Sequence, residues 1–310
     1  KATSEFQLNR IPPPRMHYYP ALDVGRLILS GADRVKFLHN FCTADIKRMQ
    51  VGDLREAFVL NLKGKLHGHV HVLCREESLE LISWPNQTEI LRTHLDRFLI
   101  REKVAFHSAD LAGTGFLFGS TADSAPIEAV PLGSWRQFGN GEAACLIAAG
   151  EFCGPGWLVL PSDPRAAAGA VSLPFDVSRF QVASESQLEH WRVSHACPRF
   201  GVDSSDETLP QELQRDEKAI SFDKGCYLGQ ETVARIDSLG HVNRLLVKVS
   251  LSAIPAATLP AEIRSQEAVV GTLTSIAPAD PQPLGLATVK RSASKSGQRL
   301  SCGEVELVVL

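Results

Sequence analysis

The sequence lacks the long apolar runs that a membrane-spanning helix requires. Its longest apolar stretches, 145–150 and 156–161, fall far short of the roughly 20 residues needed to cross a bilayer. An excess of positive charge is also absent, because 32 Lys and Arg residues face 35 Asp and Glu residues, giving a net charge of −3. This balance offers no general attraction to nucleic acid or to an anionic membrane. We therefore expect a soluble protein with no direct nucleic-acid partner and no membrane partner.

Paired cysteines are absent too, since the seven cysteines are scattered and form no C-x-x-C pair of the kind used in zinc or dithiol sites. This pattern favours a reducing compartment, in which most cysteines serve as small buried apolar residues. Residues 1–14 contain no apolar core of a secretory signal. The expected location is a bacterial-type cytoplasm, or an organelle matrix if a transit peptide has been removed upstream of Lys1.

What is present is an ordinary globular composition, with 44% apolar and 22% charged residues in 310 positions. Apolar residues at helical spacing predict helices at 87–100 and 184–193. Short apolar runs between turn residues predict strands at 25–30, 57–62, 66–74, 79–84, 104–106, 115–118, 144–148 and 157–160. Strand-sized segments beyond Arg244 indicate a small barrel or sandwich. The sequence thus predicts a mixed α+β protein, with the acidic segment 202–218 as a surface loop.

Residues 223–235 carry the strongest chemical signal, reading Asp-Lys-Gly-Cys-Tyr-Leu-Gly-Gln-Glu-Thr-Val-Ala-Arg. Gly225 and Gly229 permit positive φ angles or close backbone approach, and we expect the thiol and the phenol between them to lie at a surface. Lys224 and a helix that starts near Gly229 would favour the thiolate form of Cys226. A cysteine taken alone is more often buried and inert, but these neighbours favour a reactive thiol.

The motif K-G-C-Y-x-G-Q-E, followed by an arginine, resembles the signature of the YgfZ-type proteins, which are folate-binding iron–sulfur cluster assembly factors of the YgfZ/GcvT superfamily. Weaker matches occur in the same order along the chain. They are the G-x-D-x-x-x-F-L opening at 31–38 with Thr43-Ala44-Asp45, the N-x-x-G-K turn at 61–65, the segment 95–104, and the segments 271–275 and 284–287. The resemblance covers about residues 20–310.

This resemblance implies an α+β fold in which GcvT-like folate-binding domains surround a central channel, followed by a small C-terminal β-barrel. The implied division is an N-terminal arm at 1–19, a folate-binding region at 20–240 and the barrel at 241–310. Two intertwined α+β subdomains would form the middle region, with 112–170 making most of the second. The implied cofactor is tetrahydrofolate or a one-carbon derivative, whose pterin needs hydrogen bonds at its ring edge and apolar contacts on its faces.

The function that the resemblance implies is support of iron–sulfur cluster assembly or repair in client enzymes, including tRNA-modifying radical enzymes. The partners would be folate and iron–sulfur client or assembly proteins, and Cys226 would supply the reactive thiol. A single thiol cannot hold a four-cysteine cluster, so a bound cluster would be transient or shared between chains. The motif positions carried over as the surroundings of the cofactor are Lys224, Gly225, Tyr227, Gly229, Gln230, Glu231 and Arg235.

Two departures separate the chain from the aminomethyltransferases of glycine cleavage, which it resembles in fold. Those enzymes carry an acidic pair where this chain has Gly68 and His69, and a glutamate in place of Ser194. Loss of the acids removes the obvious proton-transfer group, typically worth about 10² to 10⁴ in rate. The chain is therefore expected not to be an enzyme of the usual kind. Two alternatives stay open: a tetrahydrofolate-dependent aminomethyltransferase that uses His69, and a non-catalytic folate-binding interaction module in which Cys226 only packs.

Three histidines, His67, His69 and His71, alternate along a predicted strand and would share one face. Neighbouring side chains on that face lie about 6.6 to 7 Å apart, which suits poorly three ligands on one ion at about 2.0 to 2.1 Å. We therefore assign no metal site and predict that these histidines form a polar sheet face or line the channel.

Overall fold

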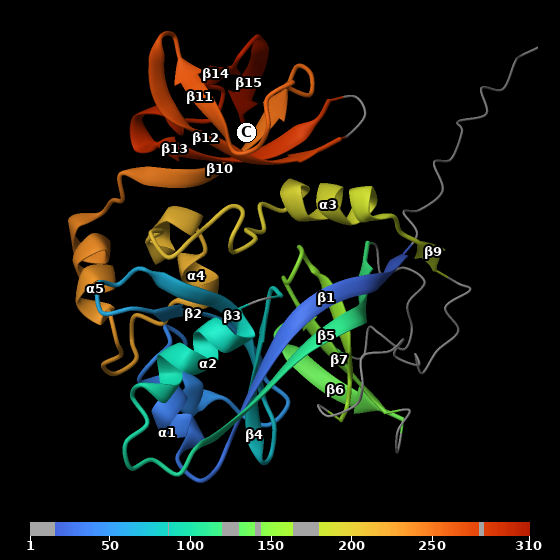
Figure 1. The fold of residues 1–310 in the computed structure, drawn as a ribbon, viewed down its shortest axis with the longest axis vertical. Coiled ribbons are helices and arrows are strands. Elements are labelled where there is room, and N and C mark those ends of the chain that lie inside the picture. Colours follow the sequence, from blue (N-terminus) through green and yellow to red (C-terminus); the bar gives the residue numbers. More distant parts are fainter. Residues whose placement is uncertain (1–15, 86, 120–129, 140–143, 164–179, 279–281) are drawn as a thin grey trace, which may run out of the picture.

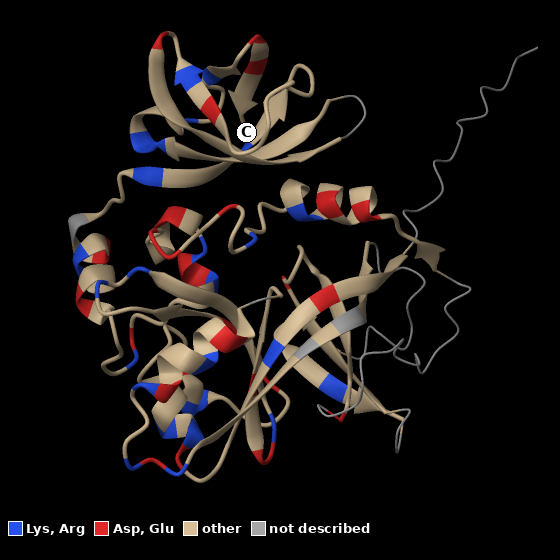
Figure 2. Cartoon of the chain, viewed as in Figure 1, with Lys and Arg blue, Asp and Glu red and all other residues tan. Residues whose placement is uncertain are grey.

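Most of the chain forms one large sheet and one β-barrel, with short helices between them, in the computed structural model (Figure 1). The structure describes residues 16–85, 87–119, 130–139, 144–163, 180–278 and 282–310. Within these residues, none of the helices has the length and apolar character needed to span a bilayer. Acidic and basic residues are interspersed over the elements in the view of Figure 2, in keeping with the balanced composition.

The large sheet contains nine strands in the order β2-β3-β4-β1-β5-β8-β7-β6, with β9 paired to β1. Its strands are β1 (His17–Ser30), β2 (Leu54–Leu60), β3 (Leu66–Cys74), β4 (Ser78–Ser83), β5 (Ala105–Phe118), β6 (Ser134–Phe138), β7 (Cys145–Gly150), β8 (Gly156–Pro161) and β9 (Gln181–Val182). Neighbours along the main path are antiparallel, and β9 alone among the described strands pairs in parallel. Strand β1 lies at the centre, between β4 and β5.

The two ends of this sheet meet, which makes it nearly closed. The N–H of Leu54, at the start of β2, donates to the carbonyl of Gly133 at 2.8 Å, and the N–H of Trp135 in β6 donates to the carbonyl of Gly52 at 2.8 Å. Strand β5 pairs with β1 along most of its length and continues into the pairing with β8. The strands at the two ends of the path therefore belong to one curved sheet.

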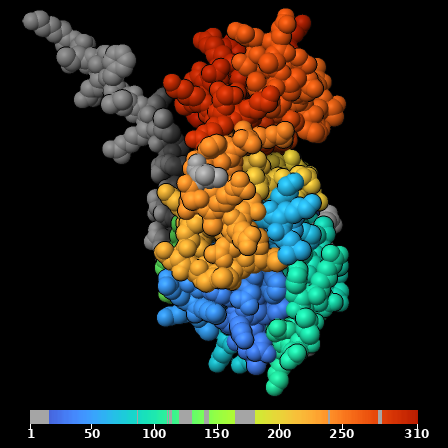
Figure 3. Space-filling view, turned by 90° about the vertical axis from the view of Figure 1, so that its left-hand side faces the viewer, coloured from blue at the N-terminus to red at the C-terminus, as the bar shows by residue number. Residues whose placement is uncertain are grey.

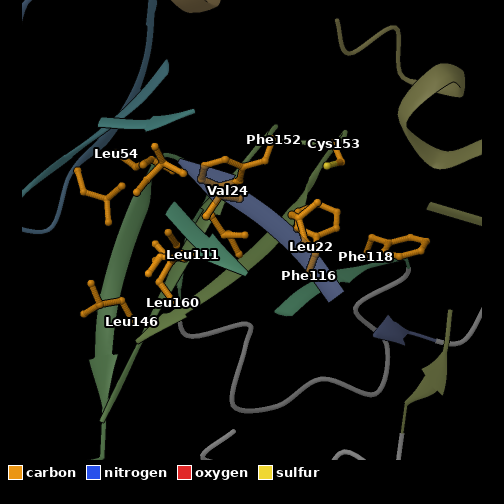
Figure 4. Close-up of a cluster of buried hydrophobic side chains, with 14 of the residues drawn as sticks. Leu22, Val24, Leu54, Leu111, Phe116, Phe118, Leu146, Phe152, Cys153 and Leu160 are labelled. Atoms are coloured by element: carbon orange, nitrogen blue, oxygen red, sulfur yellow. The ribbon is translucent and has the colours of Figure 1, made fainter. Parts of the chain in front are cut away.

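Short helices cover this sheet and enclose two apolar cores. They are α1 (Arg34–His39), α2 (Thr88–Asp96), α3 (Glu185–Ser194), α4 (Asp216–Ala219) and α5 (Gln230–Leu239). Helices α1 and α2 bury Phe37, Leu38, Leu91 and Leu95 in the first core. In the second core, side chains of β1, β5, β7 and β8 converge with Phe152 (Figure 4).

The C-terminal part forms a closed six-stranded barrel, which confirms the prediction for that part of the chain. Its strands are β10 (Arg244–Leu251), β11 (Ala261–Ser265), β12 (Ala268–Ala277), β13 (Leu284–Lys290), β14 (Arg299–Cys302) and β15 (Val305–Val309). The barrel closes where β10 pairs with β15, Val249 opposite Val309. Its interior is filled by fully buried apolar side chains such as Ile263, Leu273 and Leu307.

The prediction of a surface loop at 202–218 is wrong. The segment contains a 3-10 helix at Pro210–Leu213 and helix α4, and it buries Asp203 and Arg215, each 4% exposed. Both charges are paired inside the protein, Asp203 with Arg192 and Arg215 with Glu56. Charged groups can be buried when they are paired, and composition alone does not reveal a partner that lies far away in the sequence.

The structure describes parts of two segments predicted from the sequence, the N-terminal arm at 1–19 and the subdomain segment at 112–170. Strand β1 begins at His17, so residues 17–19, which the sequence placed in an N-terminal arm, belong to the sheet. The rest of that arm, residues 1–15, lies outside the described residues. Within 112–170, the parts at 120–129, 140–143 and 164–170 also lie outside them. The described strands of 112–170 continue the sheet of β1 to β4.

Candidate functional site

The K-G-C-Y motif is fastened to the segment around α1 by Lys224. The ammonium group of Lys224 is buried and donates hydrogen bonds to the carbonyl oxygens of His39, Cys42 and Ala44, at 2.6, 2.7 and 2.8 Å. Burial lowers the pKa of Lys224. Three carbonyl partners match the three donors of an ammonium group. Lys224 is therefore an anchor of the motif, and an effect of its charge on the neighbouring thiol stays a prediction.

The glycine before α5 is required by close packing on the β2–β3 turn. Gly229 has a φ of +80°, and a Cβ at this position would lie 2.7 Å from the carbonyl oxygen of Asn61. On the turn, a Cβ at Gly64 would lie 2.5 Å from the Cβ of Thr232, whose hydroxyl donates to a carbonyl of the turn at 3.0 Å. The N-x-x-G-K turn and the K-G-C-Y motif thus form one packed unit, visible beside α5 in Figure 3.

Cys226 presents its thiol at the surface of this unit. Of the seven cysteines, all within the described residues, six are buried and Cys226 is exposed. Burial raises the pKa of Cys42, Cys145 and Cys197 to about 11, so these thiols stay protonated at neutral pH. A solvent-borne reactant therefore reaches Cys226 first.

Tyr227 is buried beneath the motif, at 8% exposure, although the sequence suggested a phenol at the surface. Its ring packs in a cluster with Val233 and lies 4.9 Å from the Lys224 nitrogen. Burial raises the pKa of Tyr227 to about 12. The N–H of Tyr227 donates to Oε1 of Gln230 at 3.3 Å, which ties the loop to the first turn of α5. The buried ring of Tyr227 and the hydrogen bond to Gln230 together hold the loop in place.

The remaining motif positions are exposed. A Cβ at Gly225 would have its nearest neighbour, Nε2 of His39, 4.0 Å away, so the backbone beside the thiol faces open space. Glu231 and Arg235 lie on α5, and among the described contacts no ion pair joins them.

A cleft of about 520 Å³ lies elsewhere in the fold, between β1, the start of α2, α3 and residues 199–202. Its apolar lining includes Leu22, Trp84, Leu188 and Phe200. These side chains come from segments far apart in the sequence, which the fold of the chain brings together. None of the eight motif positions, Lys224, Gly225, Cys226, Tyr227, Gly229, Gln230, Glu231 and Arg235, is among the described residues that line it.

Two polar groups distinguish this cleft. The guanidinium of Arg199 lies 4.6 Å from the ring centroid of Trp84, on one wall, and contacts Glu189 at 3.3 Å. Gln87 is 2% exposed, and neither its amide oxygen nor its amide nitrogen has a hydrogen-bond partner in the described structure. Most buried polar groups are paired, so the unpaired amide of Gln87 is an exception, and both of its polar atoms are enclosed from solvent.

A small inner chamber of about 20 Å³ adjoins the cleft, sharing Leu22 and Trp84 with it. His69, His71 and Phe152 also line this chamber. Burial lowers the pKa of His71 to about 3, so its imidazole is neutral at physiological pH. The Nε2 atom of His71 has no hydrogen-bond partner in the described structure.

Next to this chamber lies a buried charge network. Nε2 of His69 is 2.7 Å from Oε1 of Glu56, and Arg215 donates to Oε2 of Glu56 at 2.6 Å. Burial would raise the pKa of Glu56, but the hydrogen bonds from Arg215 and His69 outweigh it and hold this pKa well below its usual range. Arg215 also pairs with Glu151 at 3.0 Å. A fixed carboxylate therefore orients the His69 imidazole at the chamber wall.

Comparison with known proteins gives relatives in sequence and in fold. No family model matches the chain. It is 26% identical to the tRNA-modifying protein YgfZ of Colwellia psychrerythraea over 237 residues, covering 75% of this chain and 71% of that protein. It is also 26% identical to the tRNA-modifying protein YgfZ of Yersinia enterocolitica over 238 residues, covering 74% and 70%. The expected YgfZ resemblance is confirmed.

The fold of the chain matches a solved structure. The glycine cleavage system aminomethyltransferase T of Bartonella henselae superimposes with a TM-score of 0.78 over 96% of this chain and 85% of that one, at 14% identity. At this identity the likeness concerns the fold alone. The predicted GcvT-like α+β fold with a C-terminal barrel is thereby confirmed.

The candidate site residues of the chain fall into two places that the sequence did not separate. Motif positions lie around α1 and α5, whereas the cleft is lined by other elements. The contact of motif positions with a cofactor stays a prediction. The three histidines do not meet at one point: His67 packs against His94, with ring centroids 4.1 Å apart, while His69 and His71 line the inner chamber.

Sequence reasoning missed Glu56, Gln87 and Arg215. For Glu56 the local signal is weak, because it follows the charged Arg55 and lies just before the predicted strand at 57–62. Arg215 lies in the acidic segment 202–218, whose composition predicts a surface loop. Gln87 lies at the start of a helix, where an exposed polar residue is common, and nothing local indicates that its side chain is buried.

Proposed function

We propose that this chain is a folate-binding accessory protein that supports the assembly or repair of iron–sulfur clusters in client enzymes, tRNA-modifying radical enzymes among them. One observation carries the proposal: a pterin-sized cleft and an exposed motif thiol occur in the same fold but at separate places. The names of the relatives, tRNA-modifying protein YgfZ, support the client class.

The cleft suits tetrahydrofolate in size and lining. Its volume of about 520 Å³ lies in the range of small-molecule sites, roughly 300 to 1,000 Å³. Trp84, Leu188 and Phe200 offer apolar surface for the faces of a pterin. Arg199 offers a cation for a carboxylate of the glutamate tail, a pairing that is strong when it is partly shielded from water. Bound folate would supply a reduced pterin, and these residues would orient it.

The role proposed for Cys226 is that of a transient ligand or a nucleophile toward a cluster under assembly. The loop that carries it is held on both sides, by the Lys224 anchor and by the packing of Gly229. A fixed backbone keeps an exposed thiol in one position, where a client can reach it. One thiol does not complete a four-thiolate site, so the other ligands would come from the client or an assembly protein.

A second candidate is tetrahydrofolate-dependent aminomethyl transfer. The observation that favours it is the His69 imidazole, which lines the inner chamber and is oriented by the ionised Glu56. A histidine in this position could move a proton to or from a bound folate. Formation of methylenetetrahydrofolate and ammonia from an aminomethyl donor would support this candidate over the first.

The test is calorimetric titration with tetrahydrofolate under anaerobic, reducing conditions, together with complementation of a strain that lacks the YgfZ function. We expect Cys226→Ser to bind tetrahydrofolate within about twofold of the parent protein, because the thiol is outside the cleft, but to fail in restoring cluster-dependent enzymes. Asp223→Asn, an exposed neighbour in the same loop, is the control and should complement. Full complementation by Cys226→Ser would remove the thiol from the proposal, and absence of binding by the parent protein would remove folate.

A further inference from the structure

A buried imidazole, that of His39, lies against the loop that carries the exposed thiol. His39 is the last residue of α1, its side chain is 4% exposed, and its carbonyl is one of the three acceptors of the Lys224 ammonium group. Its Nε2 atom lies 4.0 Å from the position of a Cβ added at Gly225, nearer than any other described atom outside the adjoining loop residues. Gly225 immediately precedes Cys226. One nitrogen of the ring therefore lies beside the open space next to the thiol.

The other ring nitrogen of His39 is turned inward, toward a carboxylate. Nδ1 lies 3.4 Å from Oδ1 of Asp45, and both atoms are enclosed from solvent with no other hydrogen-bond partner in the described structure. Asp45 also contacts Arg48, whose Nε lies 3.2 Å from Oδ2. A carboxylate beside Nδ1 favours the tautomer that carries its proton on that atom and leaves the lone pair on Nε2. His39 thus offers a proton acceptor on the side of the loop.

The surroundings of His39 keep its ring neutral at physiological pH. Burial lowers the pKa of His39. The positive charges of Lys224 on the motif loop and of Lys47 on the 3-10 helix at Ile46–Arg48 act in the same direction, and Asp45 opposes them. A neutral imidazole can accept a proton, which is the form needed beside a thiol that has to lose one.

We infer that His39, oriented by Asp45, is the proton acceptor of Cys226, so that the motif presents a thiolate to the iron of a cluster under assembly. This inference rests on the proposed function, in which Cys226 is a transient ligand, and names the base that this role requires. As the S–Fe bond forms, the S–H bond breaks, its electron pair stays on the sulfur and its proton moves to Nε2, from which water removes it. The step needs no oxidant or reductant.

The other groups of the loop are unsuited to this task. Lys224 spends its three donors on carbonyl oxygens, and burial raises the pKa of the Tyr227 phenol to about 12. Among the described contacts, no hydrogen bond yet joins the thiol of Cys226 to the ring of His39. An exposed side chain changes rotamer within nanoseconds, and pairs of nucleophile and base are often loose before a reactant binds.

The experiment measures the rate at which iodoacetamide alkylates Cys226 in the full chain at pH 7 and at pH 9.5, because the thiolate is the form that reacts. His39→Gln should lower the rate at pH 7 about tenfold and change it less than about twofold at pH 9.5, where a thiol ionises without a base. Asp45→Asn keeps the ring but can donate to Nδ1 and so favours the wrong tautomer, which should lower the rate at pH 7 about three- to tenfold. His107→Gln, at an exposed position of β5, is the matched control and should react as the parent protein does at both pH values.

The ratio of the two rates separates a base from a merely structural histidine. A structural histidine changes access to the thiol, so His39→Gln would alter both rates by the same factor or leave both unchanged, and either result would overturn the inference. Mass spectrometry of the alkylated protein checks the fold, since the six buried thiols react only on unfolding. If His39→Gln takes up more than one label, Asp45→Asn decides, and a ratio equal to that of the parent protein would overturn the inference. Complementation by Cys226→Ser tests the proposed function separately, so the two can fail independently.

Discussion

At the scale of single residues, the titration of His71 links stability to pH. Its folded-state pKa of about 3 lies below the value of about 6.5 expected for an unfolded chain, because burial disfavours the charged ring. Between these two values the unfolded chain binds a proton that the folded protein does not. Stability from a neutral His71 is therefore fully present above about pH 6.5 and falls as the pH decreases toward about 3.

We expect His71→Leu to flatten the decline in the free energy of unfolding between pH 6 and pH 4. For one such histidine the decline is at most about 1.4 kcal/mol per pH unit. Urea unfolding at pH 7, 6, 5 and 4 measures it. His107→Leu, at an exposed position of β5, is the control. Equal slopes for His71→Leu and His107→Leu would contradict this assignment.

The residue scale also shows what a motif predicts and what it does not. The exposure of Cys226 follows from its place between two glycines, and the structure has it exposed. The directions of the Lys224 and Tyr227 side chains do not follow from the motif. Lys224 contacts residues about 180 positions earlier in the sequence. Tyr227 packs in a core that only the folded chain creates. Side-chain direction next to a cysteine depends on tertiary partners that spacing does not encode.

At the scale of elements, the start of α5 depends on the β2–β3 turn. Gly229 and Gly240 flank the helix with the same φ of +80°, but their surroundings differ. At Gly229 an added Cβ would overlap the Asn61 carbonyl, whereas at Gly240 nothing lies within 4 Å. Substitutions at Gly229 and Gly240 therefore distinguish the cost of backbone strain, which both share, from the cost of close packing, which only Gly229 has.

Gly240→Ala should lower the free energy of unfolding by about 1 kcal/mol, the cost of a left-handed alanine. Gly229→Ala adds the displacement of the turn and should cost about 2 to 4 kcal/mol. Chemical denaturation of both variants measures the difference. Similar losses in the free energy of unfolding for the two variants would show that the β2–β3 turn moves aside at little cost, and would contradict this prediction.

The elements that the sequence predicted are those with a strong local pattern. The β2–β3 hairpin, helix α3 and the C-terminal strands have clear apolar periods and turn residues, and each is present. Strand β6 was missed because its five residues, Ser134–Phe138, are half-buried or exposed and lack apolar alternation. The predicted strands at 104–106 and 115–118 are one strand, β5, since pairing with β1 extends through the polar residues between them.

At the scale of the whole molecule, a buried polar network joins the barrel to the large sheet's layer of helices. Arg192 of α3 pairs with Asp203 at 2.7 Å and donates to the hydroxyl of Ser275 in β12 at 2.7 Å. Ser275 in turn donates to Asp203 at 2.6 Å, as does Thr274. The charges are desolvated together, so each hydrogen bond of the network supports the others.

Ser275→Ala removes one acceptor from Arg192 and one donor from Asp203. We expect a loss of about 1 to 3 kcal/mol in the free energy of unfolding, because two buried charges each lose a partner. Ser301→Ala, on β14 and outside this network, is the control and should change stability by less than about 0.5 kcal/mol. Calorimetry also reports whether the barrel then unfolds at a lower temperature than the sheet, as a weakened junction requires.

The cleft is the feature that the sequence could predict least. Its described lining residues come from β1, from Trp84, Pro85 and the start of α2, from α3 and from residues 199–202, and no local pattern connects these segments. The resemblance to a channel-containing fold predicted that a cavity exists. The identity of the groups that line it depends on how the curved sheet and the helices pack together.

The distribution of the thiols has a practical consequence. With six sulfur atoms enclosed and one at the surface, a maleimide dye added to the native protein should attach at a single position, 226, away from the cleft. The labelled molecule could then be tethered to a sensor chip in a uniform orientation. The number of dyes incorporated per chain would also serve as a direct gauge of how much of a sample is folded.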